Sequence, residues 1–267
     1  MVDVSAYPRM LMRGFKPFDP LWLARETEKM VCRGHARKYT AFYATGVYGG
    51  IATGYCVGCC LRCFYCWSEW SRDFPEIYGR FYTYEEAYKR ISNVAKSYGV
   101  RKARISGCEP TLCREHLIGL LELFDRSKEV DLFILETNGI IFGSDESYVK
   151  EISRFKKVHV RVSLKAAYPT TFTIRTGGMG EAYELPFKAI KHLLRHGVSF
   201  HVAAMTDPRI MSRKERLELI RKLAEIDEVV AANLEEEVCD PYETTIVRMY
   251  VYGIDPVRFF RRRLSSY

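Results

Sequence analysis

The sequence has no uninterrupted apolar run of about 18 residues, the length that a membrane-spanning helix needs. Its first residues also lack the basic stretch followed by an apolar stretch that marks a secretory signal peptide. No internal repeat, low-complexity tract or long linker interrupts the 267 residues. These absences exclude a membrane-spanning protein and argue against secretion.

Blocks of like charge are also rare. The formal net charge of +8 is spread along the chain, and Arg261–Arg263 is the one basic run. A mild basic excess is compatible with a nucleic acid, with an acidic partner or with an ordinary solvated surface. Nine cysteines without an export signal indicate a reducing compartment, so we expect a cytoplasmic protein with free thiols.

From residue 47 onward, strand-like segments alternate with amphipathic helical ones. The predicted strands are residues 47–55, 101–106, 130–136, 158–164, 198–205 and 228–234. Such alternation predicts an α/β fold with a parallel sheet and helical crossovers. Six units are fewer than the eight of a complete barrel.

The chain is expected to have three parts. Residues 1–46 form an N-terminal extension, 47–235 the core, and 236–267 a C-terminal extension that packs on the core. In the last part, residues 244–252 are a candidate strand, and Asp255-Pro256 is a favourable start for a basic helix.

The most informative stretch is residues 56–66, which contains five of the nine cysteines. Cys59, Cys63 and Cys66 have the spacing C-x3-C-x2-C. A loop of this length can place three thiolates on three corners of a cubane iron–sulfur cluster. The fourth iron then stays open to a substrate or cofactor.

Zinc, ferredoxin and disulfide interpretations fit these cysteines less well. Cys56 and Cys59, together with Cys63 and Cys66, resemble a four-cysteine zinc site, but zinc ribbons separate their pairs by roughly 12 to 20 residues. Only three residues intervene here. The ferredoxin spacing C-x2-C-x2-C-x3-C is absent, and nothing marks a secreted disulfide framework. An open-iron cluster is therefore favoured, with zinc as the alternative.

The pattern Cys59-x3-Cys63-x-Tyr65-Cys66 resembles the signature of the radical S-adenosylmethionine (SAM) enzymes. The resemblance implies an open partial (β/α)6 barrel, a [4Fe-4S] cluster on the three cysteines, and SAM bound to the open iron. It further implies reductive cleavage of SAM to a 5′-deoxyadenosyl radical, which abstracts hydrogen from a substrate. Tyr65 would lie beside the adenine of SAM.

Further motifs follow the predicted strands. Gly107-Cys108-Glu109-Pro110 follows the second strand, Thr137-Asn138-Gly139 follows the third, and Lys165 ends the fourth. Functional loops of parallel α/β folds gather at the carboxyl ends of the strands. These motifs and the cysteine loop should therefore share one rim.

The fourth predicted strand alternates in character. Its residues 158, 160, 162 and 164 are apolar, whereas His159, Arg161, Ser163 and Lys165 would face a central site. Lys165 could hold the carboxylate of SAM and Ser163 could reach the ribose. On the fifth strand, His201 is a candidate for the same pocket, with a structural histidine as the alternative.

Two motifs extend the family resemblance. Gly107-Cys108-Glu109-Pro110 is similar to the Gly-Gly-Glu-Pro motif that holds the methionyl amino group, with Cys108 in place of the second glycine. Residues 136–139 and 163–165 resemble the Asp-Thr-Asn-Gly and Asp-Leu-Lys motifs of glycyl-radical activating enzymes. The Ser-x-Lys end also resembles 7-carboxy-7-deazaguanine synthase.

The sequence therefore predicts a radical SAM enzyme with one [4Fe-4S] cluster, SAM and a low-potential electron donor such as ferredoxin or flavodoxin. The substrate classes left open are a small molecule, an RNA base and a protein site. A non-catalytic iron–sulfur or zinc module that binds nucleic acid or protein is the alternative. Such a module should have a concentrated basic or aromatic surface, and only the C-terminal tail indicates one. An electron carrier is the other alternative, and it would have no reason to carry Glu109 and Lys165 on the rim of the cluster.

Overall fold

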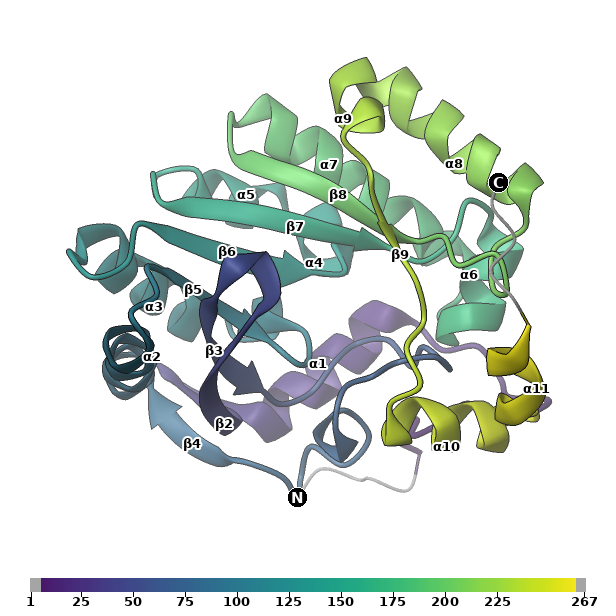
Figure 1. The fold of residues 1–267 in the computed structure, drawn as a ribbon, viewed down its shortest axis with the longest axis horizontal. Helices are drawn as coiled ribbons and strands as arrows, with labels where there is room; N and C mark the ends of the chain where they lie inside the picture. Colours follow the sequence, from purple (N-terminus) through teal and green to yellow (C-terminus); the bar gives the residue numbers. More distant parts are fainter. Residues whose placement is uncertain (1–5, 263–267) are drawn as a thin grey trace.

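A computed structural model describes residues 6–262, so Arg263 of the basic run lies outside the described residues. One mixed sheet organises the fold (Figure 1), with the strand order β1-β2-β3-β5-β6-β7-β8-β9 and β4 paired to β2. Its strands are β1 (Cys32–Arg33), β2 (Ala36–Thr45), β3 (Ile51–Cys56), β4 (Arg80–Thr83), β5 (Lys102–Ser106), β6 (Leu132–Thr137), β7 (Val158–Leu164), β8 (Ser199–Met205) and β9 (Glu235–Glu237).

The helices connect the strands and cover the sheet. They are α1 (Pro20–Val31), α2 (Tyr84–Tyr98), α3 (Arg114–Arg126), α4 (Ile140–Ser144), α5 (Glu146–Ile152), α6 (Pro169–Thr176), α7 (Leu185–Arg195), α8 (Arg213–Ile226), α9 (Glu228–Ala232), α10 (Glu243–Tyr252) and α11 (Pro256–Arg261). Helix α2 packs against β2, β3 and β5, and α7 packs against β7 and β8. None of the helices within residues 6–262 is long and apolar enough to cross a membrane.

The six strands from β3 to β9, β4 excepted, pair in parallel, and the sheet stays open. This confirms the predicted α/β partial barrel. The core comes from apolar side chains of the strands and of the helix faces packed on them, such as Ile105, Phe133 and Val160, which have no exposed surface. Burial of this kind is the main force that holds the layers together.

The sixth predicted strand, residues 228–234, is wrong. Residues Glu228–Ala232 form α9, because the Asp227 side chain caps the helix by accepting a hydrogen bond from the backbone N–H of Val230. The sixth parallel strand is β9, which pairs with the end of β8. A short apolar run such as 229–232 fits a helix or a strand equally well, so its pattern misled the prediction.

The candidate strand at residues 244–252 is also wrong, because this segment is α10. Its β-branched and aromatic residues favour a strand. The buried positions Thr245, Arg248 and Met249, however, follow the spacing of a helix face, and Gly253 ends the helix at φ 89°. The predicted helix at Asp255-Pro256 is confirmed as α11, capped by the Asp255 side chain.

The N-terminal part contributes to the same sheet. Strand β2 pairs antiparallel with β3, so the predicted boundary between residues 46 and 47 falls inside a continuous sheet. The division into three parts stays a prediction. Against the expectation of nine free thiols, Cys32 and Cys113 form a disulfide across 81 residues, with Cα atoms 5.7 Å apart. Nothing local in the sequence marks two cysteines that meet only after folding.

Helices α4 and α7 approach closely at Gly143. A Cβ atom added there would overlap the carbonyl oxygen of Leu185 and lie 2.8 Å from its Cα. Both of these neighbours are backbone atoms, so neither can rotate away. This contact holds the segment that begins immediately after Asn138 and Gly139 on the rim of the sheet.

The close approach generates a stability prediction. Gly143→Ala should lower the free energy of unfolding by about 1–3 kcal/mol, because the added methyl group forces two helices apart. Gly46→Ala is the matched control, since nothing lies within 4 Å of its Cβ position and its φ is −77°. The control should be neutral or stabilising by about 0.4–1 kcal/mol. Urea unfolding of both variants tests this, and equal losses would contradict the packing argument.

Candidate active site

A cavity of about 170 Å³ opens at the carboxyl ends of the parallel strands. Each of the six strands sends residues to it from its last position or from the loop that follows, for example Gly107 after β5, Asn138 after β6 and Lys165 after β7. The predicted gathering of the motifs on one rim is therefore confirmed. The geometry follows from parallel pairing, which brings all carboxyl ends to one edge.

Three of the five clustered thiols face this cavity. Cys59, Cys63 and Cys66 line it, whereas Cys56 and Cys60 do not. Cys56 is the last residue of β3 and is fully buried, and Cys60 lies 3.3 Å from the Asn138 amide nitrogen, which donates to its sulfur. The loop thus separates the set Cys59, Cys63 and Cys66 from the two remaining thiols, as the spacing predicts.

The three thiols differ in acidity. The hydrogen bond with Cys60 lowers the pKa of Cys59 to about 7. Burial raises the pKa of Cys63 to about 12. For Cys66 burial acts in the same direction, but Arg72 and Arg248 prevail and lower its pKa. A bound metal deprotonates its thiol ligands, and a wall with one buried and two partly buried thiols suits such a group.

The thiols do not converge on a single point. Among residues 6–262, no three histidine, cysteine, aspartate or glutamate side chains form a group able to hold one metal ion. Ligands of a cubane cluster each bind a different iron atom, so they need to surround a volume instead of a point. The cavity in front of Cys59, Cys63 and Cys66 provides such a volume.

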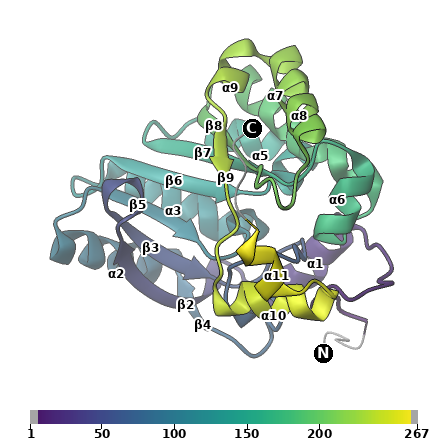
Figure 2. The ribbon, with the colours of Figure 1, turned by 45° about the vertical axis from the view of Figure 1, so that its right-hand side comes forward.

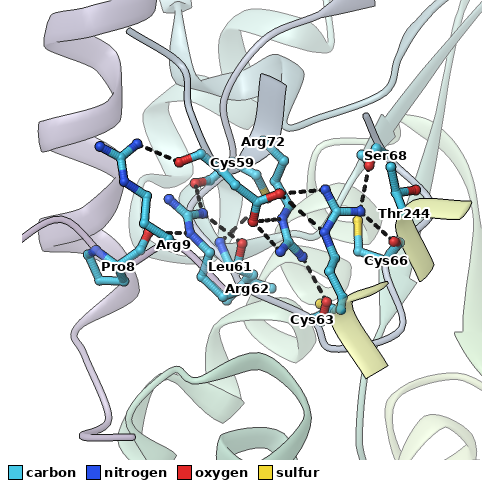
Figure 3. Close-up of polar contacts among 12 residues, drawn as sticks. Pro8, Arg9, Cys59, Leu61, Arg62, Cys63, Cys66, Ser68, Arg72 and Thr244 are labelled. Carbon is cyan, nitrogen blue, oxygen red and sulfur yellow. Dashed lines mark hydrogen bonds and ion pairs between the residues drawn. The ribbon is translucent and has the colours of Figure 1, made fainter. Parts of the chain in front are cut away.

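Buried arginines shape the cysteine loop (Figure 3). Arg62 donates to the carbonyl oxygen of Cys59 at 2.8 Å, and Arg72 donates to that of Cys63 at 2.7 Å. Arg248 of α10 donates to the carbonyl oxygen of Cys66 at 2.6 Å. Each of the three cysteines therefore has its own arginine.

One carboxylate joins two of these arginines. Asp73 accepts from Arg72 through one oxygen and from Arg248 at 2.5 Å through the other. The side chains of Asp73, Arg72 and Arg248 are 0%, 2% and 1% exposed. Thr244 of α10 adds a hydrogen bond to the carbonyl of Trp67 at 2.8 Å, so the start of this helix is tied to the end of the cysteine loop.

Glu109 joins loops from two other strands. One carboxylate oxygen accepts from the backbone N–H and hydroxyl of Thr111 and from the hydroxyl of Thr137, at 3.1, 2.7 and 2.7 Å. The other accepts from the backbone N–H of Asn138 at 2.8 Å. Arg37 of β2 holds the same turn by donating to the carbonyl of Glu109 at 2.7 Å. Glu109 is thus a junction of the rim as well as a cavity residue.

The polar face of β7 continues from the rim into the barrel. Lys165 donates to the Ser163 hydroxyl at 2.5 Å, and Ser163 donates to Glu237 at 3.0 Å. Arg161 pairs with Glu235 and Glu237, both at 2.8 Å. The expected alternation on this strand is confirmed for Arg161, Ser163 and Lys165, which line the cavity. His159, at the start of the strand, does not line it and pairs with Ser199 and His201.

Nine of the twelve predicted site residues line the cavity, namely Cys59, Cys63, Tyr65, Cys66, Gly107, Glu109, Asn138, Ser163 and Lys165. Pro110, Thr137 and His201 do not. Thr137 donates to Glu109, and the carbonyl oxygen of Pro110 accepts from Arg37. His201 instead contacts His159 at 2.7 Å and Glu235 at 2.8 Å. The hydrogen bonds from His201 and Arg161 lower the pKa of Glu235 to about 2. His201 is therefore a structural partner of that carboxylate.

Tyr65 carries an unsatisfied polar atom. Its ring is 6% exposed and borders the cavity, yet its hydroxyl has no hydrogen-bond partner within the described part of the chain. Buried hydroxyl groups nearly always have a partner. A ligand in the cavity would supply one.

Comparison with known proteins agrees with this geometry. The sequence profile of the Radical SAM superfamily matches residues 55–223, from the last two residues of β3 to the last turn of α8. The chain belongs to the radical SAM superfamily. This family implies SAM and a [4Fe-4S] cluster, and the three thiols that line the cavity fit the cluster.

The curated relatives are GTP 3′,8-cyclases. The one from Desulforamulus reducens is 31% identical over 150 residues, or 55% of this chain and 44% of that protein. A probable GTP 3′,8-cyclase from Methanococcus maripaludis is 32% identical over 120 residues, or 45% and 37%. The chain thus covers less than half the length of these relatives.

Solved structures of radical SAM proteins share the fold. TYW1 with a lysine-pyruvate adduct bound gives a TM-score of 0.53 at 15% identity over 85% of this chain and 83% of that one. HydG, a maturase of the [FeFe]-hydrogenase, gives 0.56 at 12% identity over 83% and 47%. At these identities the likeness supports the fold alone, which confirms the partial barrel.

Several residues of the site were missed by sequence reasoning. Trp67 and Tyr242 border the cavity with ring centres 6.3 Å apart, and Glu237 accepts from β7. Trp67 follows Cys66 directly, so its position could have been a signal. Tyr242 and Arg248 lie about 180 residues away, and no local pattern connects them to the cysteines.

The hydrogen bonds of Glu109 generate a prediction about stability. Glu109→Ala should lower the free energy of unfolding by about 3 kcal/mol, since it leaves buried donors of Thr111, Thr137 and Asn138 without their acceptor. Lys165→Ala removes a half-buried side chain with one hydrogen bond and should change stability by less than about 1 kcal/mol. Urea unfolding measures both, and equal effects would contradict the role of Glu109 as a junction.

Proposed function

We propose that this protein binds a [4Fe-4S] cluster through Cys59, Cys63 and Cys66 and uses it with SAM to abstract hydrogen from a substrate. The observation that carries the proposal is the separation of thiols, since these three alone among the five clustered cysteines face the cavity. When bound, the cluster and SAM together supply a 5′-deoxyadenosyl radical. A low-potential ferredoxin or flavodoxin is the electron donor.

The residues around the cavity have distinct tasks in this proposal. Lys165 holds the carboxylate of SAM, and the turn from Gly107 to Glu109 receives its amino group. Tyr65 borders the adenine, and its buried hydroxyl gains a partner. Ser163 lies 2.5 Å from Lys165 and orients it.

The enclosure of the site suits radical chemistry. Cys63 and Tyr65 are 8% and 6% exposed, and the loop is closed from behind by Arg72, Asp73 and Arg248. Such walls keep water from a reactive intermediate. Trp67 and Tyr242 are 43% and 54% exposed and stand at the open side, where a substrate enters.

A small molecule, an RNA base and a protein site are the substrate classes considered. Nucleotides are the first to test, because the curated relatives are GTP 3′,8-cyclases. Formation of 5′-deoxyadenosine should rise above the rate seen without substrate when the right class is added. A purified protein that holds zinc and forms no 5′-deoxyadenosine would instead support the non-catalytic module.

Replacing a single cysteine tests the ligand set. Cys59→Ala, Cys63→Ala and Cys66→Ala should each abolish the iron–sulfur absorbance after anaerobic reconstitution and stop SAM cleavage. Cys56→Ala and Cys60→Ser should retain both, because neither thiol faces the cavity. Iron and sulfide content per chain is the measurement, and a requirement for Cys56 equal to that for Cys63 would overturn the proposal.

Binding of SAM tests the roles of Lys165 and Tyr65. Lys165→Ala removes a charge-assisted hydrogen bond worth about 1.5–3 kcal/mol, so SAM affinity should fall roughly 10- to 150-fold. Lys165→Arg keeps the charge and should retain most of the affinity. Tyr65→Phe should weaken SAM binding roughly 2- to 10-fold without destabilising the protein, since its hydroxyl has no partner to lose.

Titration of the reconstituted protein with SAM, followed by paramagnetic resonance of the reduced cluster, measures these affinities. Unchanged affinity in both Lys165→Ala and Tyr65→Phe would mean that SAM does not lie between β7 and the cysteine loop.

A further inference from the structure

The arginines behind the cysteine loop carry more positive charge than the loop needs for its hydrogen bonds. Arg62, Arg72 and Arg248 are all buried, at 0%, 1% and 1% exposure. Asp73 balances one of the three charges. The network therefore has a net charge of plus two, obtained as three guanidinium groups less one carboxylate.

Arg62 is the clearest case of an unbalanced charge. Its guanidinium donates to the carbonyl oxygens of Pro8 at 2.6 Å, Cys59 at 2.8 Å and Leu61 at 2.9 Å. Its second terminal nitrogen is buried with no hydrogen-bond partner, and no carboxylate lies within ion-pair distance of it among residues 6–262. A buried charge without a counter-charge is costly, so an anion nearby is expected.

The neighbouring acidic groups do not supply that anion. Glu76 is paired with Arg9 at 2.8 Å, at the edge of the network. Glu109 points to Thr137 and Asn138, and Glu237 faces Arg161 and Ser163 on the other side of the cavity. What the three arginines share is the loop of Cys59, Cys63 and Cys66, because each binds the carbonyl oxygen of a different one of them (Figure 3).

One of the three arginines lies outside the residues that match the radical SAM profile. The match ends at residue 223, whereas Arg248 comes from α10. In Figures 1 and 2 the chain runs from β9 away from the sheet to α10. Arg248 reaches the carbonyl oxygens of Cys66, Ser68 and Glu69 from there. The C-terminal segment therefore adds a charge of its own to the cysteine loop.

We propose that Arg62, Arg72 and Arg248 are positioning residues that hold the three cysteines and favour the reduced state of the cluster by their uncompensated positive charge. This inference rests on the proposed cluster at Cys59, Cys63 and Cys66. A cubane core bound by three thiolates carries a net negative charge, which increases when an electron is added. Positive charge in a low-dielectric surrounding stabilises the more negative form and so raises the reduction potential.

The test removes a positive charge and, in a second variant, a negative charge from the ion pair of Arg72 with Asp73. Arg72→Met removes a positive charge and should move the midpoint potential of the reconstituted cluster to a more negative value. Asp73→Asn removes the one negative charge and should move it to a more positive value. If the two residues had only a structural role, Arg72→Met and Asp73→Asn would not shift the midpoint potential in opposite directions. Redox titration followed by paramagnetic resonance measures the potential.

Two further variants complete the design. Arg209→Met is the matched control, since Arg209 forms a buried ion pair with Asp207 and, within residues 6–262, makes no hydrogen bond or ion pair with residues 56–69. It should keep the wild-type potential. Arg248→Lys retains the positive charge but loses the several N–H donors of the guanidinium group. The midpoint potential of the cluster in this variant should therefore stay near the wild-type value. Equal potentials in all variants, or shifts of Arg72→Met and Asp73→Asn in the same direction, would overturn the inference.

If Arg72→Met fails to fold or to bind iron, Arg62→Met replaces it, because this change leaves the contacts of Asp73 intact. A more negative potential in Arg62→Met supports the inference, and an unchanged potential overturns it. The wild-type protein separates this outcome from the proposed function. A wild type without iron and sulfide would refute the cluster itself, whereas a loaded wild type with insensitive variants refutes only the role of the arginines.

Discussion

The ion pair of Asp73 with Arg72 and Arg248 is the contact on which the site depends most. It joins the segment after the cysteine loop to a helix that lies about 175 residues further along the chain. A buried pair of this kind gives little net stability, but removal of one partner leaves a charge unpaired and typically costs about 3–5 kcal/mol. The pair therefore acts as a constraint on position. The shape of the loop and the position of α10 are therefore coupled.

A second constraint acts on the opposite side of the cavity. The Glu109 carboxylate connects the loops after β5 and β6, and Arg37 of β2 holds the turn of Glu109 from behind. The two sides have a common design, in which a buried arginine from outside the predicted core binds backbone carbonyls of a functional loop. Arg37 comes from the N-terminal extension and Arg248 from the C-terminal one. Residues before position 47 and after position 235 thus both contribute contacts that fix the geometry of the rim, as precise sites require.

Sequence reasoning performed best where function depends on local spacing. The C-x3-C-x2-C pattern identified the three thiols that face the cavity, and alternation along β7 identified Arg161, Ser163 and Lys165 as inward-facing. It failed at the sixth strand, where a short apolar run formed α9, and at α10, whose strand-like composition gave way to a helix with a buried face. In both cases packing against the rest of the chain outweighed intrinsic propensity. His201 lies outside the cavity lining and pairs with His159 of β7 and Glu235 of β9, so the structural alternative left open for it describes its contacts.

The sequence by itself determined the parallel α/β class, the thiol set and the order of the motifs along the rim. These features depend on periods of two or 3.6 residues and on fixed spacings, which any segment carries in its own residues. Only the tertiary structure decided which thiols pair as Cys32 and Cys113, and that one carboxylate holds two arginines of distant origin. It also decided that the carbonyl oxygens of Cys59, Cys63 and Cys66 each accept from a different arginine. Such contacts join residues whose separation along the chain leaves no local pattern, so they become visible only when the sheet brings its loops and both extensions to one edge.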